Sequence, residues 1–249
     1  MIDLIWNASD IATIRLNRPD KKNAMTPEML DRFCETVAES RGRARAIIVC
    51  GAGDVFCSGF DLAMCLQDAG VLAALLKGLS RAIVALREHP APVVAAAHGA
   101  AIAGGCALLC GADVVVTHDD AKFGYPVVRL GISPAVNAPF LNQSMGAGSA
   151  RARLLDTQLI SGREATRLGL AHECVPAAAE TLGRAQSIAM ELAAKPRSGL
   201  EATKAWLSEM DESADRDRIE ESLTASLGLV GSPEERERLA KMFASSVHR

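Results

Sequence analysis

Apolar and polar residues alternate with the period of a strand near the start of this chain and with the period of a helix later on. Residues 2–6 and 11–17 alternate as strands do, on either side of a short polar turn, which predicts a β-hairpin. A helix to about Arg41 is predicted next, because Thr26-Pro27-Glu28 offers a capping hydroxyl, a proline at the first helical position and an acid in the first turn. Residues 45–51 are continuously apolar, as in a strand that is buried on both faces.

The middle of the chain is its most apolar part. Residues 92–116 read PVVAAAHGAAIAGGCALLCGADVVV, which predicts a strand, a loop of small residues, a buried helix and a second strand. Gly104-Gly105 lies where the loop meets the helix. Around this stretch we expect helices at 62–67, 71–87, 147–155 and 163–168, a helix with Pro139 in its first turn, strands at 112–117, 122–123 and 173–175, and a loop at 124–134.

Beyond Pro176 the pattern is helical only, with breaks at Pro196, at an acidic pair and at Pro233. The expected helices are 177–194, 197–209, 213–229 and 233–246. Strand and helix units followed by a helical end indicate an α/β protein with a core at residues 1–195 and a C-terminal helical region at 196–249.

Composition narrows the class of protein. The chain has 249 residues, of which 49% are hydrophobic, and a formal net charge of -3 without a basic block, which argues against nucleic acid as a partner. Seven cysteines, an odd number without a CxxC pair, indicate reduced thiols in a cytoplasmic protein, and no metal-binding spacing is present. The start of the chain does not resemble a targeting peptide. The apolar stretch 91–112 contains His98 and several glycines, and we interpret it as core, with no membrane span expected.

Two glycine-rich segments each follow a buried strand, and together they indicate chemistry. Gly104 would open a helix with free N–H groups, and Phe60 follows the glycine of the segment Phe56-Cys57-Ser58-Gly59. A pair of N–H donors is what an oxyanion hole requires to hold a carbonyl oxygen while its negative charge grows. Phe60 and Gly104 are therefore the candidate donors.

With these segments in view, the sequence resembles the crotonase (enoyl-CoA hydratase/isomerase) superfamily. The resemblance implies a spiral of β-β-α units with a C-terminal helical region that builds a trimer or a dimer of trimers. It also implies an acyl-CoA substrate whose thioester carbonyl lies in the oxyanion hole, with no cofactor besides the CoA part of that substrate. The residues that carry it are 14–19, 22–25, the two segments above, 121–126, 129–132, 160–165 and 168–171.

The pair of glutamates that hydratases of this family use is missing. Ala107 and Val127 stand at the matching positions, and neither accepts a proton, which argues against an ordinary hydratase mechanism. An enoyl-CoA hydratase or isomerase type of enzyme with another proton carrier is the leading hypothesis; decarboxylation and thioester hydrolysis are open, as is a non-catalytic acyl-CoA binding protein. A serine peptidase is disfavoured, because Ser58 has no nucleophile-elbow setting.

Other residues complete the candidate site. Tyr125 and Asn137 are favoured as catalytic groups over His98, Asp61 and Asp68, which are more often a structural histidine, a helix cap and a surface acid. By the resemblance, Lys22, the loop 52–58 and Lys241 with Phe243 are expected near CoA. The candidate residues for contacts to the substrate or CoA are Lys22, Ala52, Cys57, Ser58, Asp61, Gly105, Val127, Lys241 and Phe243.

Overall fold

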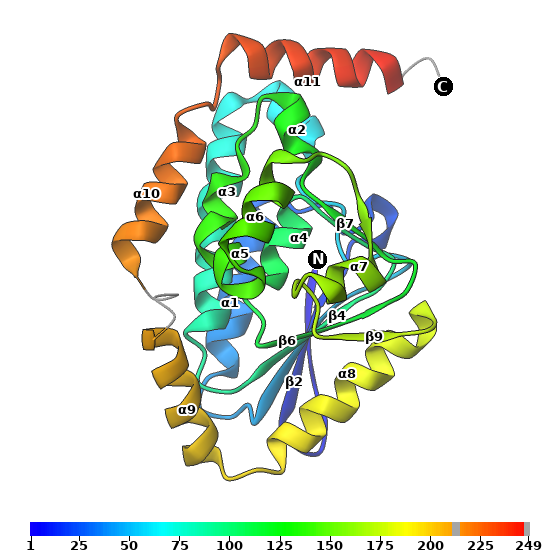
Figure 1. Ribbon diagram of the computed structural model, residues 1–249, viewed down its shortest axis with the longest axis vertical. Coiled ribbons are helices and arrows are strands. Elements are labelled where there is room, and N and C mark those ends of the chain that lie inside the picture. The colour runs from blue at the N-terminus through cyan, green and yellow to red at the C-terminus, as the bar shows by residue number, and fades with distance from the viewer. Residues whose placement is uncertain (211–214, 247–249) are drawn as a thin grey trace.

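The computed structural model describes residues 1–210 and 215–246 and arranges them around a large, mostly parallel sheet (Figure 1). The first two strands form the predicted antiparallel hairpin, and the strands after it pair in parallel. In their order across the sheet, the strands are β1 (Ile2–Trp6), β2 (Ile11–Leu16), β3 (Ala46–Gly51), β4 (Val93–Ala97), β6 (Val114–His118) and β9 (Glu173–Val175).

Helices lie on both sides of this sheet, and their bounds follow the sequence expectations closely. The helix predicted after Thr26 begins at Pro27, and the Thr26 side chain accepts a hydrogen bond from the Met29 N–H. The α-helices are α1 (Pro27–Ser40), α2 (Leu62–Gln67), α3 (Ala69–Arg87), α4 (Gly104–Leu109), α5 (Ala138–Met145), α6 (Ala147–Leu155), α7 (Gly162–Arg167) and α8 (Ala178–Ala193), followed by α9 (Arg197–Met210), α10 (Arg216–Leu227) and α11 (Pro233–Ser246). Three short 3-10 helices are η1 (Pro19–Lys21), η2 (Pro126–Leu130) and η3 (Pro134–Asn137) within the described ranges.

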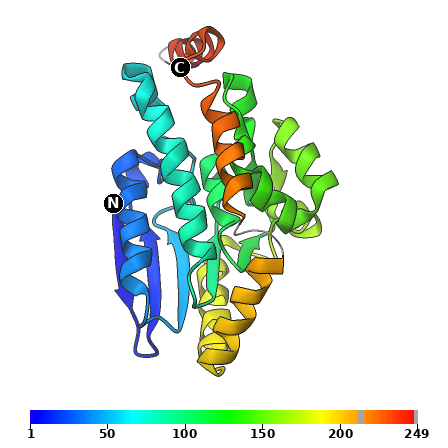
Figure 2. The same ribbon diagram turned by 90° about the vertical axis from the view of Figure 1, so that its left-hand side faces the viewer.

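The central strands are buried on both faces, which explains their uninterrupted apolar sequence. Ile47 and Val49 of β3 belong to the cluster that contains the inner faces of α1 and α3. Ile48 points to the opposite face, where the alanines of α8 pack on the sheet. Figure 2 shows α1 in blue and α3 in cyan running side by side, with α8 in yellow at the lower end of the molecule.

A small second sheet, in the order β5-β7-β8, was only partly predicted. β7 (Lys122–Gly124) matches the short strand expected at 122–123. The predicted loop of small residues before Gly104 was wrong in part. It contains β5 (Ala100–Ile102), which pairs in parallel with β7 and also bridges Cys57. β8 (Ile160–Ser161) was not expected, and it pairs with β7 in the antiparallel direction. The predicted loop 124–134 contains η2 and the start of η3.

The C-terminal helices turn back over the core. α10 packs along α3 and η3, and α11 lies across α2 and η2 at the upper end of the molecule in Figure 1. Residue 213, where the third of these helices was expected to start, lies outside the described residues. On α9, the buried Lys204 donates from Nζ to the carboxylate of Asp113 at 2.6 Å and to two backbone carbonyls. Of the helices in the described ranges, none has the length and apolar character needed to cross a membrane.

Candidate active site

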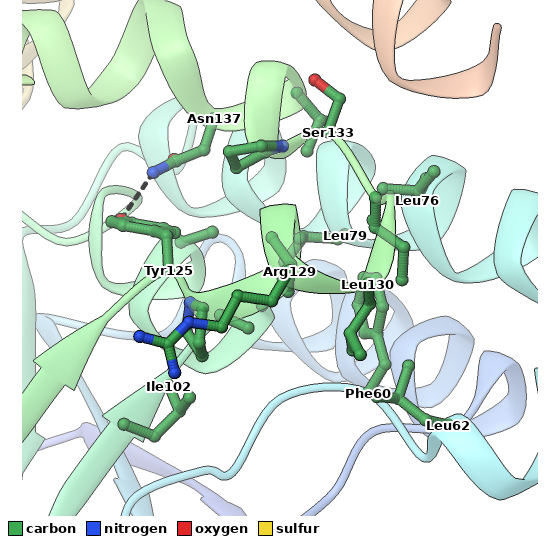
Figure 3. A pocket seen from close by; sticks show the side chains of 18 of the residues that line it. Phe60, Leu62, Leu76, Leu79, Ile102, Tyr125, Arg129, Leu130, Ser133 and Asn137 are labelled. Atoms are coloured by element: carbon green, nitrogen blue, oxygen red, sulfur yellow. Dashed lines mark hydrogen bonds between the residues drawn. The ribbon is translucent and has the colours of Figure 1, made fainter. Parts of the chain in front are cut away.

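A cavity of about 380 Å³ lies where the loop before α2 meets α4, η2 and η3 (Figure 3). One side of it is formed by leucines of α3, and Met242 of α11 closes another. Its walls are mostly apolar. The lining residues are Ser58, Phe60, Leu62, Leu76, Leu79, Ile102, Ala103, Gly104, Ala107, Tyr125, Pro126, Val127, Arg129, Leu130, Ile132, Ser133, Pro134, Val136, Asn137 and Met242.

The two candidate N–H donors, Phe60 and Gly104, both line this cavity. Met25 accepts from the N–H of Asp61 at 2.9 Å and donates to the carbonyl of Gly59 at 2.8 Å, so it pairs with the groups on either side of Phe60. The N–H of Phe60 itself is not used by that bridge. Gly104 is the first residue of α4, where a helix has no internal acceptor for its N–H groups. Within residues 1–210 and 215–246, neither N–H has a hydrogen-bond acceptor.

Close packing holds these two donors side by side. A Cβ on Gly104 would lie 2.8 Å from Cε1 of Phe60 and 2.9 Å from Cε of Met25, so a larger residue would displace both side chains. Gly59 has a φ of +103°, and a Cβ there would lie 3.8 Å from the N atom of Gly104. The two glycines therefore allow the two chain segments to approach each other.

Ala103, the residue before the first donor of α4, has a strained backbone. Its φ of 52° and ψ of -115° are rare for a residue with a side chain. The Ala103 N–H donates to the carbonyl of Gly124 at 2.8 Å, which holds the strained conformation in place. Ala103 and the first residue of α4, Gly104, both line the cavity.

Tyr125 and Asn137 are brought together in the cavity wall, as Figure 3 shows. Nδ2 of Asn137 donates to the hydroxyl oxygen of Tyr125 at 2.7 Å, and both side chains are buried. Burial, with the neighbouring thiols of Cys106 and Cys110, raises the pKa of Tyr125 well above its ordinary value. Oδ1 of Asn137 has no partner among the described residues. A tyrosine that stays neutral in this way can donate a hydrogen bond but does not act as a base near neutral pH.

Ala107 and Val127, which stand where the resemblance would place two glutamates, also lie in the cavity wall. Ala107 follows Gly104 by one turn of α4, and Val127 is on η2. Among the described residues that line the cavity there is no carboxylate. The cavity thus combines two N–H donors with neutral walls, apart from one cation, Arg129.

Among the candidate CoA or substrate contacts, Ser58 and Val127 line the cavity, whereas Cys57 and Gly105 pack behind it. The Cys57 thiol is buried and donates to the carbonyl of Asn23 at 3.1 Å. A Cβ on Gly105 would lie 2.5 Å from the Cys57 carbonyl oxygen. These two residues support the loop without facing the cavity.

Lys22 and Ala52 lie outside the cavity on a neighbouring part of the surface. Lys22 is exposed, and its carbonyl accepts from the N–H of Ser58 at 3.0 Å. Ala52 is held by Asn23, whose Nδ2 donates to its carbonyl at 2.8 Å. Asn23 also donates to the carbonyls of Val55 and Phe56, and sequence reasoning missed its role as the anchor of the loop 52–56.

The three residues ranked behind Tyr125 and Asn137 have structural contacts. Nε2 of His98 lies 2.8 Å from the Gly53 carbonyl oxygen, in agreement with a structural histidine. Asp61 precedes α2 but does not cap it; its carboxylate pairs instead with Arg18 at 2.8 Å, so the expected cap was wrong. Asp68 caps α3 by accepting from the Gly70 N–H at 2.7 Å.

On α11, the residue that reaches the cavity is Met242, between the two predicted ones. Lys241 is exposed and pairs with Glu237, and Phe243 is half-buried without lining the cavity. Arg129, Ser133 and Met242 were missed as lining residues. Arg129 and Ser133 lie in or beside segments that carry the resemblance, which was the only available signal for them.

Comparisons with known proteins agree with this geometry. The family model described as enoyl-CoA hydratase/isomerase matches residues 7–244. The chain belongs to the enoyl-CoA hydratase/isomerase family. It is 32% identical to a putative enoyl-CoA hydratase of Thermus thermophilus over 79% of this chain and 80% of that protein. It is also 32% identical to a probable enoyl-CoA hydratase of Mycobacterium tuberculosis over 92% of this chain and 93% of that one.

Solved structures of the enoyl-CoA hydratase/isomerase family share the fold. An enoyl-CoA hydratase from Bacillus halodurans superposes with a TM-score of 0.85 at 24% identity, covering 96% of this chain and 99% of that one. An enoyl-CoA hydratase/isomerase from Xanthobacter autotrophicus gives 0.84 at 26% identity, covering 98% and 96%. The crotonase fold expected from the sequence is confirmed.

Proposed function

We propose that this protein binds an acyl-CoA and stabilises the enolate of its thioester at the N–H groups of Phe60 and Gly104, without the paired glutamates of the family's hydratases. The observation that carries this proposal is the pair of unbonded N–H groups at the wall of an apolar cavity. Two fixed donors in a site with little water stabilise an oxyanion far more than the neutral carbonyl that precedes it. The reaction is of the lyase or isomerase type and involves no cofactor besides the CoA of the substrate.

The absence of glutamates at 107 and 127 limits the reaction. Tyr125 stays neutral, so the side chains described around the cavity offer no base near the Phe60 and Gly104 donors. Reactions that generate the enolate without a protein carboxylate fit this environment better than ordinary hydration. They include loss of CO₂, in which the broken C–C bond leaves its electron pair on the α-carbon and water later supplies the proton.

The proposal also includes the oligomeric state of the protein and its location in the cell. A trimer or a dimer of trimers built through the C-terminal helices is supported by α9, where Trp206, Leu207 and Met210 are exposed apolar side chains. A cytoplasmic protein is supported by the seven cysteines, all of which are free thiols.

The test uses acetoacetyl-CoA, whose enolate has its own ultraviolet absorbance, so that stabilisation is measured without turnover. Binding is expected to lower the pKa of this ligand and raise its enolate fraction. Gly104→Pro removes one N–H and should weaken the enolate-stabilising effect by about a hundredfold or more. Gly104→Ala is the matched control, because its Cβ causes the same crowding against Phe60 and Met25 but keeps the N–H.

The outcomes separate the explanations. If Gly104→Ala loses as much enolate stabilisation as Gly104→Pro, crowding explains the effect and the donor role of Gly104 is contradicted. Failure of the natural protein to bind any acyl-CoA would overturn the proposal as a whole.

A second candidate function is acyl-CoA binding without catalysis, which the carboxylate-free lining of the described cavity favours. It predicts the same enolate stabilisation as the enzyme but no turnover. Incubation with short- and medium-chain enoyl-CoAs, followed by absorbance and mass, distinguishes the two. A rate above that of the uncatalysed reaction would exclude the binding protein.

A further inference from the structure

Arg129 places a positive charge at an otherwise neutral cavity. It extends from η2, and in Figure 3 its guanidinium lies toward the Ile102 side of the cavity, below Tyr125. No other charged side chain of the described residues lines this cavity. Arg129 is exposed, so water partly screens its charge, but that charge still favours an anion over a neutral group beside these apolar walls.

One edge of the guanidinium is fixed by the protein and the rest is available. Nε donates to Oγ1 of Thr157 at 2.7 Å, which orients the planar group. No carboxylate of the described residues forms an ion pair with Arg129. The nearby Asp156 has its pKa lowered chiefly by hydrogen bonds from Gln158 and Arg153, with a smaller contribution from the charge of Arg129. Since Arg153 already pairs with Asp156, the terminal nitrogens of Arg129 are free to hold another anion.

The anion should belong to the acyl part of the ligand. Arg129 is on the same short helix as Pro126 and Val127, which line the cavity beside the Phe60 and Gly104 donors. Lys22 and Ala52, the residues expected near CoA, do not line the cavity. A carboxylate matches the fork of N–H donors in a guanidinium better than any other common acyl substituent.

We propose that Arg129 selects acyl groups that carry a second carboxylate, so that the preferred ligands are CoA thioesters of dicarboxylic acids. The inference rests on the proposed acyl-CoA function and names its substrate class. Pairing with a guanidinium stabilises a carboxylate anion. The free carboxylate of such a ligand is therefore a handle that positions the acyl chain.

Calorimetric binding of glutaryl-CoA and of its neutral terminal amide tests the proposal, because the two ligands differ in charge but hardly in size. The natural protein should bind glutaryl-CoA about tenfold more tightly, as expected for one partly exposed charge-assisted pair. In Arg129→Gln the ratio of the two dissociation constants should fall toward one. Arg129→Lys should keep part of it, since the charge remains and the fork is lost.

Arg151→Gln is the matched control, because Arg151 is an exposed arginine on α6 that does not line the cavity. This variant should keep the full preference for glutaryl-CoA. An equal loss in Arg151→Gln would mean that overall charge, and not Arg129, sets the preference.

CoA phosphates are the other possible partner of Arg129, and free CoA reveals them. If Arg129→Gln weakens the binding of glutaryl-CoA, of its amide and of free CoA by the same factor, the guanidinium holds a phosphate and the proposal is wrong. If the natural protein binds glutaryl-CoA and its amide equally well, only the substrate class fails. If it binds no thioester at all, the proposed function fails with it.

Discussion

Two side chains in the cavity wall separate this chain from a hydratase that uses paired glutamates. Ala107 and Val127 line the cavity beside the two N–H donors. We predict that Ala107→Glu combined with Val127→Glu gains addition of water to an enoyl-CoA, by about a hundredfold or more over the natural protein. The apolar walls should raise the pKa of the new carboxyls, which suits one of them to donate a proton. Loss of the conjugated thioester absorbance and a mass gain of one water measure the product.

The double variant with glutamine at both positions is the control, because glutamine has nearly the same size but cannot accept the proton. Hydration that rises equally in both double variants would show that polarity, and not proton transfer, is responsible. No gain in a glutamate variant that still binds the enoyl-CoA would mean that these positions do not face the reacting carbons.

At single residues, the sequence predicted which positions line the cavity better than what they contact. Phe60, Gly104, Tyr125 and Asn137 were all selected, and all line one cavity. The hydrogen bond between Tyr125 and Asn137 could not be foreseen, because it joins two segments that only tertiary packing brings together. Nor could the inward side of a 3-10 helix be read from the sequence, since the loop around Arg129 showed no periodicity.

Among the elements of the fold, the loop 52–56 depends on one buried side chain. Nδ2 of Asn23 donates to three carbonyls of this loop, and Oδ1 accepts from the Arg18 N–H. Asn23→Ala is predicted to lower the free energy of unfolding by about 2 to 4 kcal/mol, because it leaves buried carbonyls without donors. Its φ of 55° adds to this cost, since asparagine tolerates that conformation better than alanine.

Urea unfolding of Asn23→Ala measures that change. Asn142→Ala, on the exposed side of α5, is the control and should change the stability by less than about 0.5 kcal/mol. If the two variants have the same stability, the loop is held by its other contacts and Asn23 does not anchor it.

Long elements followed from the sequence, whereas two of the shortest strands did not. The helices and the central strands have many apolar residues at regular spacing, so α3 and β3 were predicted nearly to their ends. β5 and β8 are only three and two residues long, and they exist because they pair with β7. Pairing partners distant in sequence leave no local pattern, which is why β5 was taken for loop.

For the whole molecule, apolar runs buried on both faces correctly indicated a parallel sheet covered by helices, and the motif order identified the crotonase fold. The position of α11 over the cavity was indicated only by the resemblance and not by any local pattern. α11 has the alternating charges of an exposed helix, and among its described side chains Met242 is the one that lines the cavity. The path of a chain after its last strand depends on tertiary contacts that the sequence does not state.

Acid sensitivity is a property of the whole fold, because histidines take part in several of its internal contacts. Burial, with a smaller contribution from the charge of Lys204, lowers the pKa of His89 to about 4. Its Nδ1 accepts from the Ala91 N–H at 3.1 Å, so a proton on that nitrogen would face another donor. Burial also lowers the pKa values of His118 and His172. The folded state therefore binds fewer protons than the unfolded state below pH about 6.5.

We predict that the free energy of unfolding is fully retained above pH about 6.5 and falls as the pH is lowered toward about 4, with His89 contributing about 3 kcal/mol of the loss. His89→Gln cannot take up this proton. It should be less stable than the natural protein at pH 8, where a packed side chain has been replaced, and the difference should shrink or reverse by pH 4. Urea unfolding at pH 8, 6.5, 5 and 4 gives both curves. If they run parallel across this range, protonation of His89 does not drive the acid loss.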